Sequence, residues 1–216
     1  MNQAFIMARP RKATTQLRDA EATRNSILDA AEEEFAVGGL LGARTEAIAA
    51  RTGVTKAMIH YYFDTKEKLY VAVLERAVAA RIRNIQEGGL NELEPEEALR
   101  IFVQGVIDNC GRNVHISSIM LFEAIQNKGF YYKEIVMQSL YKPLQNILAR
   151  GVESGAFRKL DPMHVSVNII GICVFYFCAR ENLKHLWPPG TDLMSPEMLD
   201  AHEEETIKMV MASTRP

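Results

Sequence analysis

Residues 45–69 read TEAIAARTGVTKAMIHYYFDTKEKL and contain signals for two short helices joined by a glycine turn, with a third helix following. Thr45 is placed to cap a helix over about 46–51. Gly53 is expected to end that helix, because glycine adopts the left-handed conformation without steric cost. Thr55 is a second capping residue and opens the next helix. This layout is typical of a helix-turn-helix.

The second helix, over about 56–62, has one face that is expected to pack inward. Ile59 and Phe63 lie one turn apart on that face. The side chains left on the outer face or at its flank are Lys56, Ala57, Met58, His60 and Tyr61. A helix that exposes Lys, His and Tyr suits the major groove of DNA. Helical hairpins with a glycine turn are also common in other all-helical proteins, where Tyr61 and Tyr62 would be core residues.

The flanking segments extend this pattern. Upstream, 23–35 forms an amphipathic helix that is expected to end at Gly38-Gly39. Its apolar face holds Ile27, Leu28, Ala31 and Phe35. Downstream, Lys66 opens a long helix. Together, TRNSILDAAEEEFAVGG and IAARTGVTKAMIHYYFDTKEKL resemble the N-terminal domain of the TetR family of one-component bacterial regulators, over residues 23–77. The remainder fits the helical ligand-binding and dimerisation domain, which diverges freely in that family.

The resemblance implies a set of residues that contact DNA. Thr45 and Lys66 match positions that hold phosphates, and Lys66 also begins a helix whose N-terminal dipole attracts anions. Met58 and His60 depart from the family, which often has Thr and a phosphate-binding Tyr there, so the usual backbone clamp is weakened or rebuilt. Arg44 replaces a common Thr or Ser and would add a phosphate contact. The full expected set is Arg44, Thr45, Lys56, Ala57, Met58, His60, Tyr61, Tyr62 and Lys66.

The composition agrees with a DNA reader joined to a sensor. The chain has 216 residues and 48% hydrophobic content, enough to bury a full core. Residues 1–83 hold 13 Lys and Arg against 10 Asp and Glu, whereas residues 84–216 hold 12 against 17. A basic first part beside an acidic remainder is typical of such regulators, although enzymes also show differences of this size.

We therefore predict an all-α fold with an N-terminal three-helix helix-turn-helix domain and a C-terminal helical ligand-binding and dimerisation domain. The expected divisions are a disordered basic arm over 1–18, a DNA-binding domain over 19–66, a connecting helix over 67–90 and an effector-binding and dimerisation domain over 91–216.

The basic arm would reach along phosphates or into a minor groove, unless it is only an unstructured leader. It carries Arg9, Arg11, Lys12 and Arg18. No apolar run follows these charges, so no signal peptide is expected. The longest apolar stretch, 169–179, is about half of the ~20 residues that a membrane span needs. We expect a soluble, cytoplasmic protein without a membrane partner.

The cysteines and histidines predict neither a metal site nor a cofactor. Cys110, Cys173 and Cys178 are odd in number and form no CxxC pair, so they are expected to be buried thiols. A redox switch would require an accessible thiolate, for example Cys110 with its pKa lowered by Arg112. No HxxxH pair occurs, and the chain lacks GxGxxG, P-loop, GxSxG and HExxH motifs. A helical enzyme or carrier is therefore disfavoured, and no catalytic residue is proposed.

Helix signals continue through the rest of the chain. Gly88-Gly89 is expected to close the connecting helix, and Pro95 suits the first turn of the next one. The later helices are expected over about 117–126, 131–155 with a kink at Pro143, 163–185 and 197–212. Asp161-Pro162 and Ser195-Pro196 supply the caps of the last two.

The last two helices favour a homodimer. The first of them is apolar around most of its circumference, so it must be covered on more than one side. In the family, the corresponding pair packs against its twin as a four-helix bundle, although periodicity alone also allows an intramolecular core. The expected dimer residues are Val165, Ile169, Ile172, Leu199, His202, Thr206, Met209 and Val210. Two copies would read palindromic half-sites about 34–36 Å apart, or a multiple of that spacing.

The middle helices are rich in aromatic residues that would suit a cavity for a small lipophilic or aromatic effector, although core packing explains most of them. The candidate lining residues are Phe102, Val106, Asn109, Met120, Phe122, Gln126, Tyr141, Asn168, Phe175 and Tyr176, with His115 and Arg180 as further polar groups. The predicted function is a homodimeric repressor of double-stranded operator DNA that a small molecule releases. An activator or a regulator that answers a protein partner is the alternative within the same fold.

Overall fold

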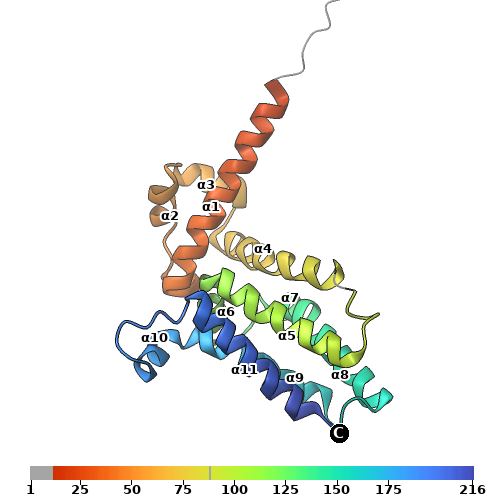
Figure 1. Ribbon diagram of the computed structural model, residues 1–216. Helices are drawn as coiled ribbons and strands as arrows, with labels where there is room; N and C mark the ends of the chain where they lie inside the picture. The colour runs from red at the N-terminus through yellow and green to blue at the C-terminus, as the bar shows by residue number, and fades with distance from the viewer. Residues whose placement is uncertain (1–11, 88) are drawn as a thin grey trace, which may run out of the picture.

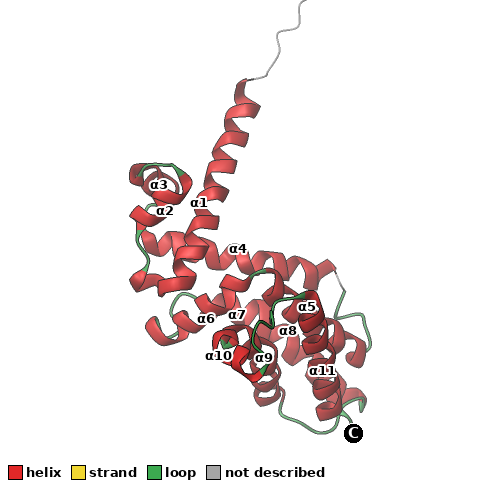
Figure 2. Cartoon of the chain, turned by 60° about the vertical axis from the view of Figure 1, so that its left-hand side comes forward, coloured by secondary structure: helices red, strands yellow, loops and turns green. Residues whose placement is uncertain are grey.

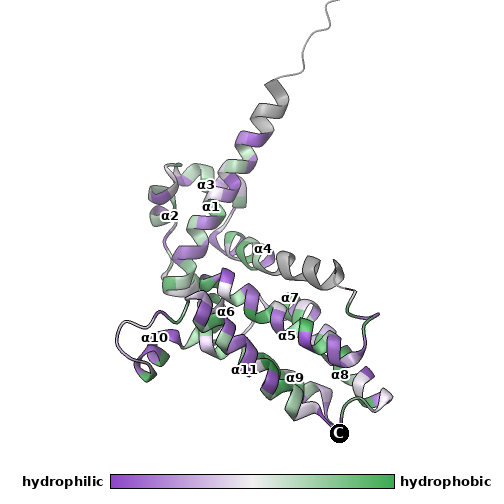
Figure 3. Ribbon diagram, in the orientation of Figure 1, coloured by the Kyte–Doolittle hydropathy of each residue, from purple (hydrophilic) through white to green (hydrophobic). Residues whose placement is uncertain are grey.

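The computed structural model describes residues 12–87 and 89–216, together with all side chains in these ranges except those of 12–17 and 78–87. Within this part of the chain, every regular element is a helix (Figure 2). Polar and apolar residues alternate along most helices, as expected where each helix buries one face (Figure 3). The all-α prediction is confirmed.

Four helices make up the N-terminal half. They are α1 (Lys12–Gly42), α2 (Thr45–Thr52), α3 (Lys56–Phe63) and α4 (Lys66–Glu87). The first helix projects from the body, α2 and α3 lie beside it, and α4 runs across towards the other half (Figure 1). The side chains that α1 buries include Ile27, Leu28, Ala31 and Phe35, as predicted.

The structure of α1 corrects one expectation and confirms another. Residues 12–18, predicted as part of a disordered arm, are helical, whereas 1–11 lie outside the described residues. The backbone of Gly39 is not helical, with φ 64° and ψ −168°, so the long helical segment of α1 ends at the glycine pair, as predicted, and a short second segment runs to Gly42. Glycine is needed there for a second reason, because an added Cβ would lie 2.3 Å from the side-chain oxygen of Gln126 on α6. The glycine pair therefore ends the first segment and changes the direction of the chain.

The remaining helices form the C-terminal half. They are α5 (Pro95–Arg112), α6 (Val114–Gln126), α7 (Lys133–Val136), the π-helical turn η1 (Met137–Tyr141), α8 (Lys142–Ser154), α9 (Pro162–Cys178), α10 (Arg180–Leu183), the 3-10 turn η2 (Lys184–Leu186) and α11 (Pro196–Thr214). Helix α5 contacts α8, α9 and α11, which places it at the centre of this bundle (Figure 1). As predicted, the Asp161 and Ser195 side chains cap α9 and α11 by accepting backbone N–H bonds.

Two predicted helices in this half differ from the structure. The helix expected to continue to residue 155 contains a widened π turn directly before Lys142 and Pro143, where proline lacks an N–H to donate. The helix expected to continue to residue 185 ends at Cys178, after which the chain bends by 67° into α10 and η2. No single described helix is long and apolar enough to cross a membrane; α9 and the segment after it pass that test only as this bent pair.

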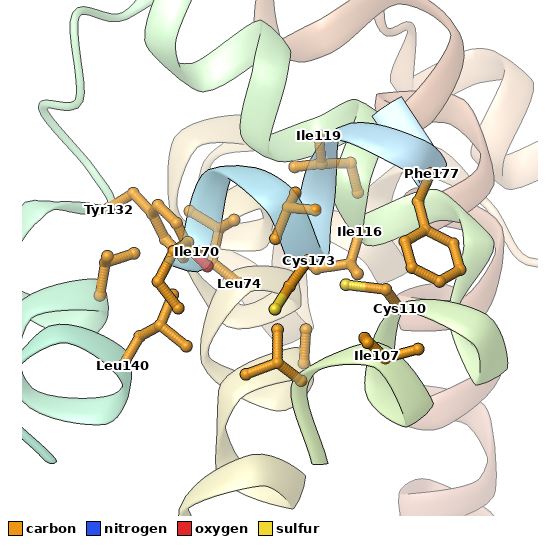
Figure 4. Close-up of a cluster of buried hydrophobic side chains, with 14 of the residues drawn as sticks. Leu74, Ile107, Cys110, Ile116, Ile119, Tyr132, Leu140, Ile170, Cys173 and Phe177 are labelled. Carbon is orange, nitrogen blue, oxygen red and sulfur yellow. The ribbon is translucent and has the colours of Figure 1, made fainter. Parts of the chain in front are cut away.

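The three cysteines lie in or against the core of the C-terminal half. Cys110 and Cys173 are fully buried among aliphatic side chains such as Ile107 and Ile116 (Figure 4). Burial also raises the pKa of Cys178 to about 11, and its thiol donates to the Ser117 carbonyl at 3.2 Å. Arg112, expected to activate Cys110 in a redox switch, is exposed and pairs with Asp108. The expected burial is confirmed for Cys110 and Cys173, whereas Cys178 is partly buried.

Candidate DNA-binding surface

The turn between α2 and α3 is built largely as the sequence predicts. Gly53 ends α2 with a φ of 71°, and the Thr55 hydroxyl caps α3 by accepting the Met58 N–H at 3.2 Å. The predicted cap at Thr45 is wrong, because α2 begins at Thr45 and the capping position is occupied by Arg44, whose side chain makes no cap bond. The Thr45 side chain lies partly exposed beside Glu46, where it remains available to a ligand.

The faces of α3 are also as predicted. Ile59 and Phe63 are buried against the rest of the domain. The exposed residues are Lys56, Ala57, Met58, His60 and Tyr61. Tyr61 is 84% exposed, and its ring packs edge-on against half-buried Tyr62 with centroids 5.4 Å apart. A neighbouring aromatic ring thus orients the outermost side chain of this helix, with its hydroxyl free to meet a partner.

Several cations near α3 are held by groups of the same chain. Lys56 pairs with Glu46 at 2.5 Å. The Lys66 ammonium donates to the Ala43 carbonyl at 3.1 Å, which fastens the start of α4 to the loop between α1 and α2. Arg44 is exposed at the surface. The cationic side chains that the sequence assigns to DNA therefore gather on one side of the domain, and Lys56 must leave a carboxylate to meet a phosphate.

Two residues of this surface were missed by the sequence argument. Arg24 of α1 lies 5.2 Å from the centroid of the Phe63 ring and places a guanidinium next to α3. Glu46 lies beside Lys56, where the hydrogen bond from the Lys56 ammonium lowers the pKa of the Glu46 carboxyl and keeps it ionised. Both contacts join separate helices, so no local spacing marks them.

Glu46→Gln is expected to strengthen DNA binding. The substitution removes a negative charge from the DNA-facing side and frees Lys56 for a phosphate, so the salt dependence should steepen by up to about 0.9 in the slope of log K against log salt. Titration of operator DNA at two or more salt concentrations measures both quantities. Glu153→Gln, an exposed substitution at the end of α8, serves as the control. Unchanged affinity and slope in Glu46→Gln would contradict a contact between Lys56 and phosphate.

The residues predicted to line an effector cavity differ in burial. Phe102, Val106 and Tyr176 are buried in the core, whereas Asn168 and Phe175 are exposed. The partly exposed members are Asn109, Met120, Phe122, Gln126 and Tyr141, together with the polar candidates His115 and Arg180. Only Asn109 and His115 line a cavity of about 490 Å³, which lies between α1, α4, α5 and the start of α6.

Gln126 has another role. Its amide donates to the Gly38 carbonyl at 3.1 Å and accepts the Leu41 N–H at 3.3 Å. These bonds fasten the end of α6 to the kinked end of α1. Gln126 is therefore a link between the two halves of the chain, a role that its position on α6 alone does not indicate.

Three of the eight predicted dimer residues face inward. Ile169, Thr206 and Val210 are buried within the chain, so they are not available to a second copy. Val165, Ile172, Leu199 and His202 are partly exposed, and Met209 is exposed. His202 stacks on the Tyr176 ring at 4.1 Å, and burial lowers its pKa. Helices α5, α6 and α8 contact α9, and α5 contacts α11, so parts of both helices are covered within the chain.

A different face of α9 is exposed and apolar. Met163, Val167 and Phe175 are 64%, 52% and 63% exposed. They share one side of the helix with Gly171, at a spacing of four residues. Met163 and Val167 were not predicted at an interface, and Phe175 was predicted to line the effector cavity, because a helix that is apolar on all sides gives no preference among its faces.

Comparisons with known proteins agree with this architecture. A family model described as "Bacterial regulatory proteins, tetR family" matches residues 27–73, and one described as "Tetracyclin repressor-like, C-terminal domain" matches residues 95–210. The HTH-type transcriptional repressor NicS of Pseudomonas putida is 30% identical over 178 residues, which cover 80% of this chain and 84% of that protein. The regulator RutR of Escherichia coli K12 is 27% identical over 153 residues, or 68% and 70%.

Solved structures show the same fold. The hemolysin II transcriptional regulator HlyIIR is similar with a TM-score of 0.69 and 24% identity, over 91% of this chain and 99% of that one. FadR of Bacillus subtilis, in complex with stearoyl-CoA, gives a TM-score of 0.71 with 19% identity, over 88% and 98%. With an exposed α3 behind a glycine turn, a helical second domain and these matches, the chain belongs to the TetR family of DNA-binding transcriptional regulators.

Proposed function

We propose that the protein is a homodimeric repressor that binds a palindromic operator in the cytoplasm and is released by a small molecule. The observation that carries the proposal is the outer face of α3, where Tyr61 projects with its ring packed against Tyr62 and where Lys56 and His60 are also exposed. The similarity to the repressor NicS, which extends over most of the chain, supports repression over activation.

The face of α3 suggests how the roles divide. Tyr61, Ala57 and Met58 are placed to meet base edges in the major groove. The side chains placed to meet phosphates are Arg44, Thr45, Lys56, His60 and Lys66. Base contacts specify the sequence, whereas phosphate contacts fix the position of the helix on the duplex. One helix of this length reads only a few base pairs, so a second copy is needed for a specific site.

The exposed apolar face of α9 supports the dimer. Met163, Val167 and Phe175 form a stripe that water covers in the single chain. Burying such side chains stabilises an interface by about 25 cal/mol for each Å² of apolar surface removed from water. Met209 of α11 is also exposed and adds an apolar side chain from a second helix. We infer that these residues, in place of the buried ones, contact the twin.

Helix α6 offers a route from the effector domain to the DNA-binding domain. Gln126 holds the end of α1, and buried Glu123 accepts a hydrogen bond from the Tyr70 hydroxyl of α4 at 3.0 Å. A shift of α6 would therefore move α1 and α4 together. A coupling free energy of about 1–3 kcal/mol between effector and operator changes affinity by about 5- to 150-fold.

The first test is selection of genomic fragments by the purified protein, which would yield the operator. Tyr61→Ala is then expected to weaken binding to that operator by about 1–3 kcal/mol, and Lys66→Ala to weaken binding to all sequences and to reduce the salt slope by about one. Gel-shift titrations at two salt concentrations measure both. Lys159→Ala, exposed and close to the start of α9, is the control. Unchanged binding in both variants would remove α3 and the start of α4 from the DNA interface.

Repression and activation are distinguished by a promoter fusion in a strain that lacks the gene. Loss of a repressor raises expression from the selected promoter, whereas loss of an activator lowers it. A thermal melt of Lys66→Ala accompanies the gel shift, because Lys66 also fastens α4 to the Ala43 carbonyl.

A further inference from the structure

We propose that the cavity between the two halves binds a small hydrophilic zwitterion, such as a free amino acid, as the effector. The proposal rests on the ligand-released repressor proposed above and names its ligand class and site. The cavity has a volume of about 490 Å³, which is within the range of small-molecule sites. Its walls come from α1, α4, α5 and the turn before α6, so one ligand would touch both halves.

One wall is built on a set of ion pairs within the N-terminal half. The Arg76 guanidinium of α4 donates to Asp29 at 2.6 Å and to Glu32 at 2.7 Å, both on α1. Glu32 is only 8% exposed, so this pair is largely shielded from water. Because both partners of Arg76 are carboxylates of α1, these ion pairs hold α4 against α1. The Glu32 carboxylate also lines the cavity.

The opposite wall carries charged side chains that can bind a ligand. Asp108 and Arg112 of α5 lie one turn apart, with a long N–O separation of 3.5 Å, and both side chains are mostly exposed. An exposed pair of this kind contributes little stability, so replacing it with ligand contacts costs little. Arg112 suits the carboxylate of a zwitterion, and Asp108 suits its ammonium group. Asn109 and His115 add further polar groups to this wall.

The same wall disfavours a lipophilic effector. Burying a charged group against an alkyl chain leaves that group without its hydration or a partner, which costs several kcal/mol. The cavity is lined by Glu32, Asp108 and two arginines, with few apolar side chains. The sequence-based expectation of a lipophilic or aromatic effector is therefore not supported by the chemistry of this cavity.

Gly105 provides a second, independent indication that the space is for a ligand. It lies inside α5, where glycine costs about 0.5–1 kcal/mol relative to alanine. Neither a positive φ nor a close neighbour requires glycine there, because an added Cβ would meet no atom within 4 Å. A larger residue at this wall would fill the cavity. The glycine thus keeps the space open at a cost to helix stability.

Filling the cavity tests the proposal without disturbing the fold. Thermal melts and operator gel shifts are measured with each of the twenty proteinogenic amino acids, and with decanoate as a lipophilic probe. At least one amino acid is expected to raise the melting temperature and to release the operator. Gly105→Leu should lose both responses while it still binds the operator and melts no lower than the wild type. Gly105→Ala, which adds one methyl group, should retain both.

A variant that removes a charge tests whether the ligand is recognised by its charge and not only by the space in the cavity. Arg112→Ala is expected to weaken the response to the amino acid by about tenfold, because a charge-assisted hydrogen bond is lost. Arg100→Ala, at an exposed site on the same helix, should leave the response unchanged. A response to decanoate alone, an unaltered response in Gly105→Leu, or no response to any amino acid would overturn the proposal. Failure of the wild type to bind operator would instead refute the proposed function.

Discussion

Phe175→Glu is expected to turn the protein into a monomer and to lower operator affinity by about a thousandfold or more, towards the non-specific level. Phe175 is 63% exposed in the apolar face of α9 that we assign to the twin. A carboxylate buried there would lie against its own copy across the two-fold axis, and neither charge would have a partner. Light scattering after size exclusion measures the mass, and a gel shift measures the affinity.

Phe130→Glu is the matched control for this experiment. Phe130 is 66% exposed but lies in the turn after α6, outside the apolar face of α9. The Phe130→Glu variant should have the same molecular mass in solution and the same operator affinity as the wild type. If Phe175→Glu stayed dimeric, the twin would have to use another surface. Ile169 and Val210 are unsuitable for the test, because they are buried and their substitution would destabilise each chain by itself.

Glu123→Ala is expected to lower the free energy of unfolding by about 3 kcal/mol or more. The Glu123 side chain is almost completely buried and accepts hydrogen bonds from the Tyr70 hydroxyl, the Asn127 amide and the Tyr131 N–H. Burial, together with the Glu123 carboxylate, raises the pKa of Tyr70, which therefore stays protonated and donates. Removing the acceptor leaves buried donors unsatisfied, at about 1–3 kcal/mol each.

Chemical denaturation of three variants tests this network. Glu134→Ala, at an exposed position on α7, should have little effect on stability. Glu123→Gln should fall between Glu134→Ala and Glu123→Ala, because its amide keeps one acceptor oxygen. If Glu123→Ala were no less stable than Glu134→Ala, the buried carboxylate would not be what fastens α6 to α4.

Features that depend on neighbouring residues could be predicted from the sequence. Gly53 ends α2 and Thr55 caps α3, because a left-handed turn and a side-chain cap are set within a few residues. The inward face of α3 follows from the one-turn spacing of Ile59 and Phe63. The outer face of α3, on which Tyr61 is exposed, could therefore be predicted. Membership of the family could be predicted as well.

The ends of two other helices could be predicted only in part. Thr45 has the chemistry of a cap, but the helix begins one residue earlier than expected, at Thr45 itself. The helix expected to end at Gly38-Gly39 does so, because the backbone of Gly39 is not helical. The close approach of Gly39 to Gln126 of α6 could not be predicted, because these residues are far apart in the chain.

The sequence by itself determined the all-helical fold, the DNA-binding hairpin and the caps of the last helices, because those depend on short-range backbone and side-chain chemistry. Only the tertiary structure decided which face of α9 remains exposed, since a helix that is apolar on all sides has no preferred face until α5 covers one of them. It also decided the hydrogen bonds of Gln126 and Glu123 and the polar cavity beside Gly105, because each unites residues that are far apart in the chain.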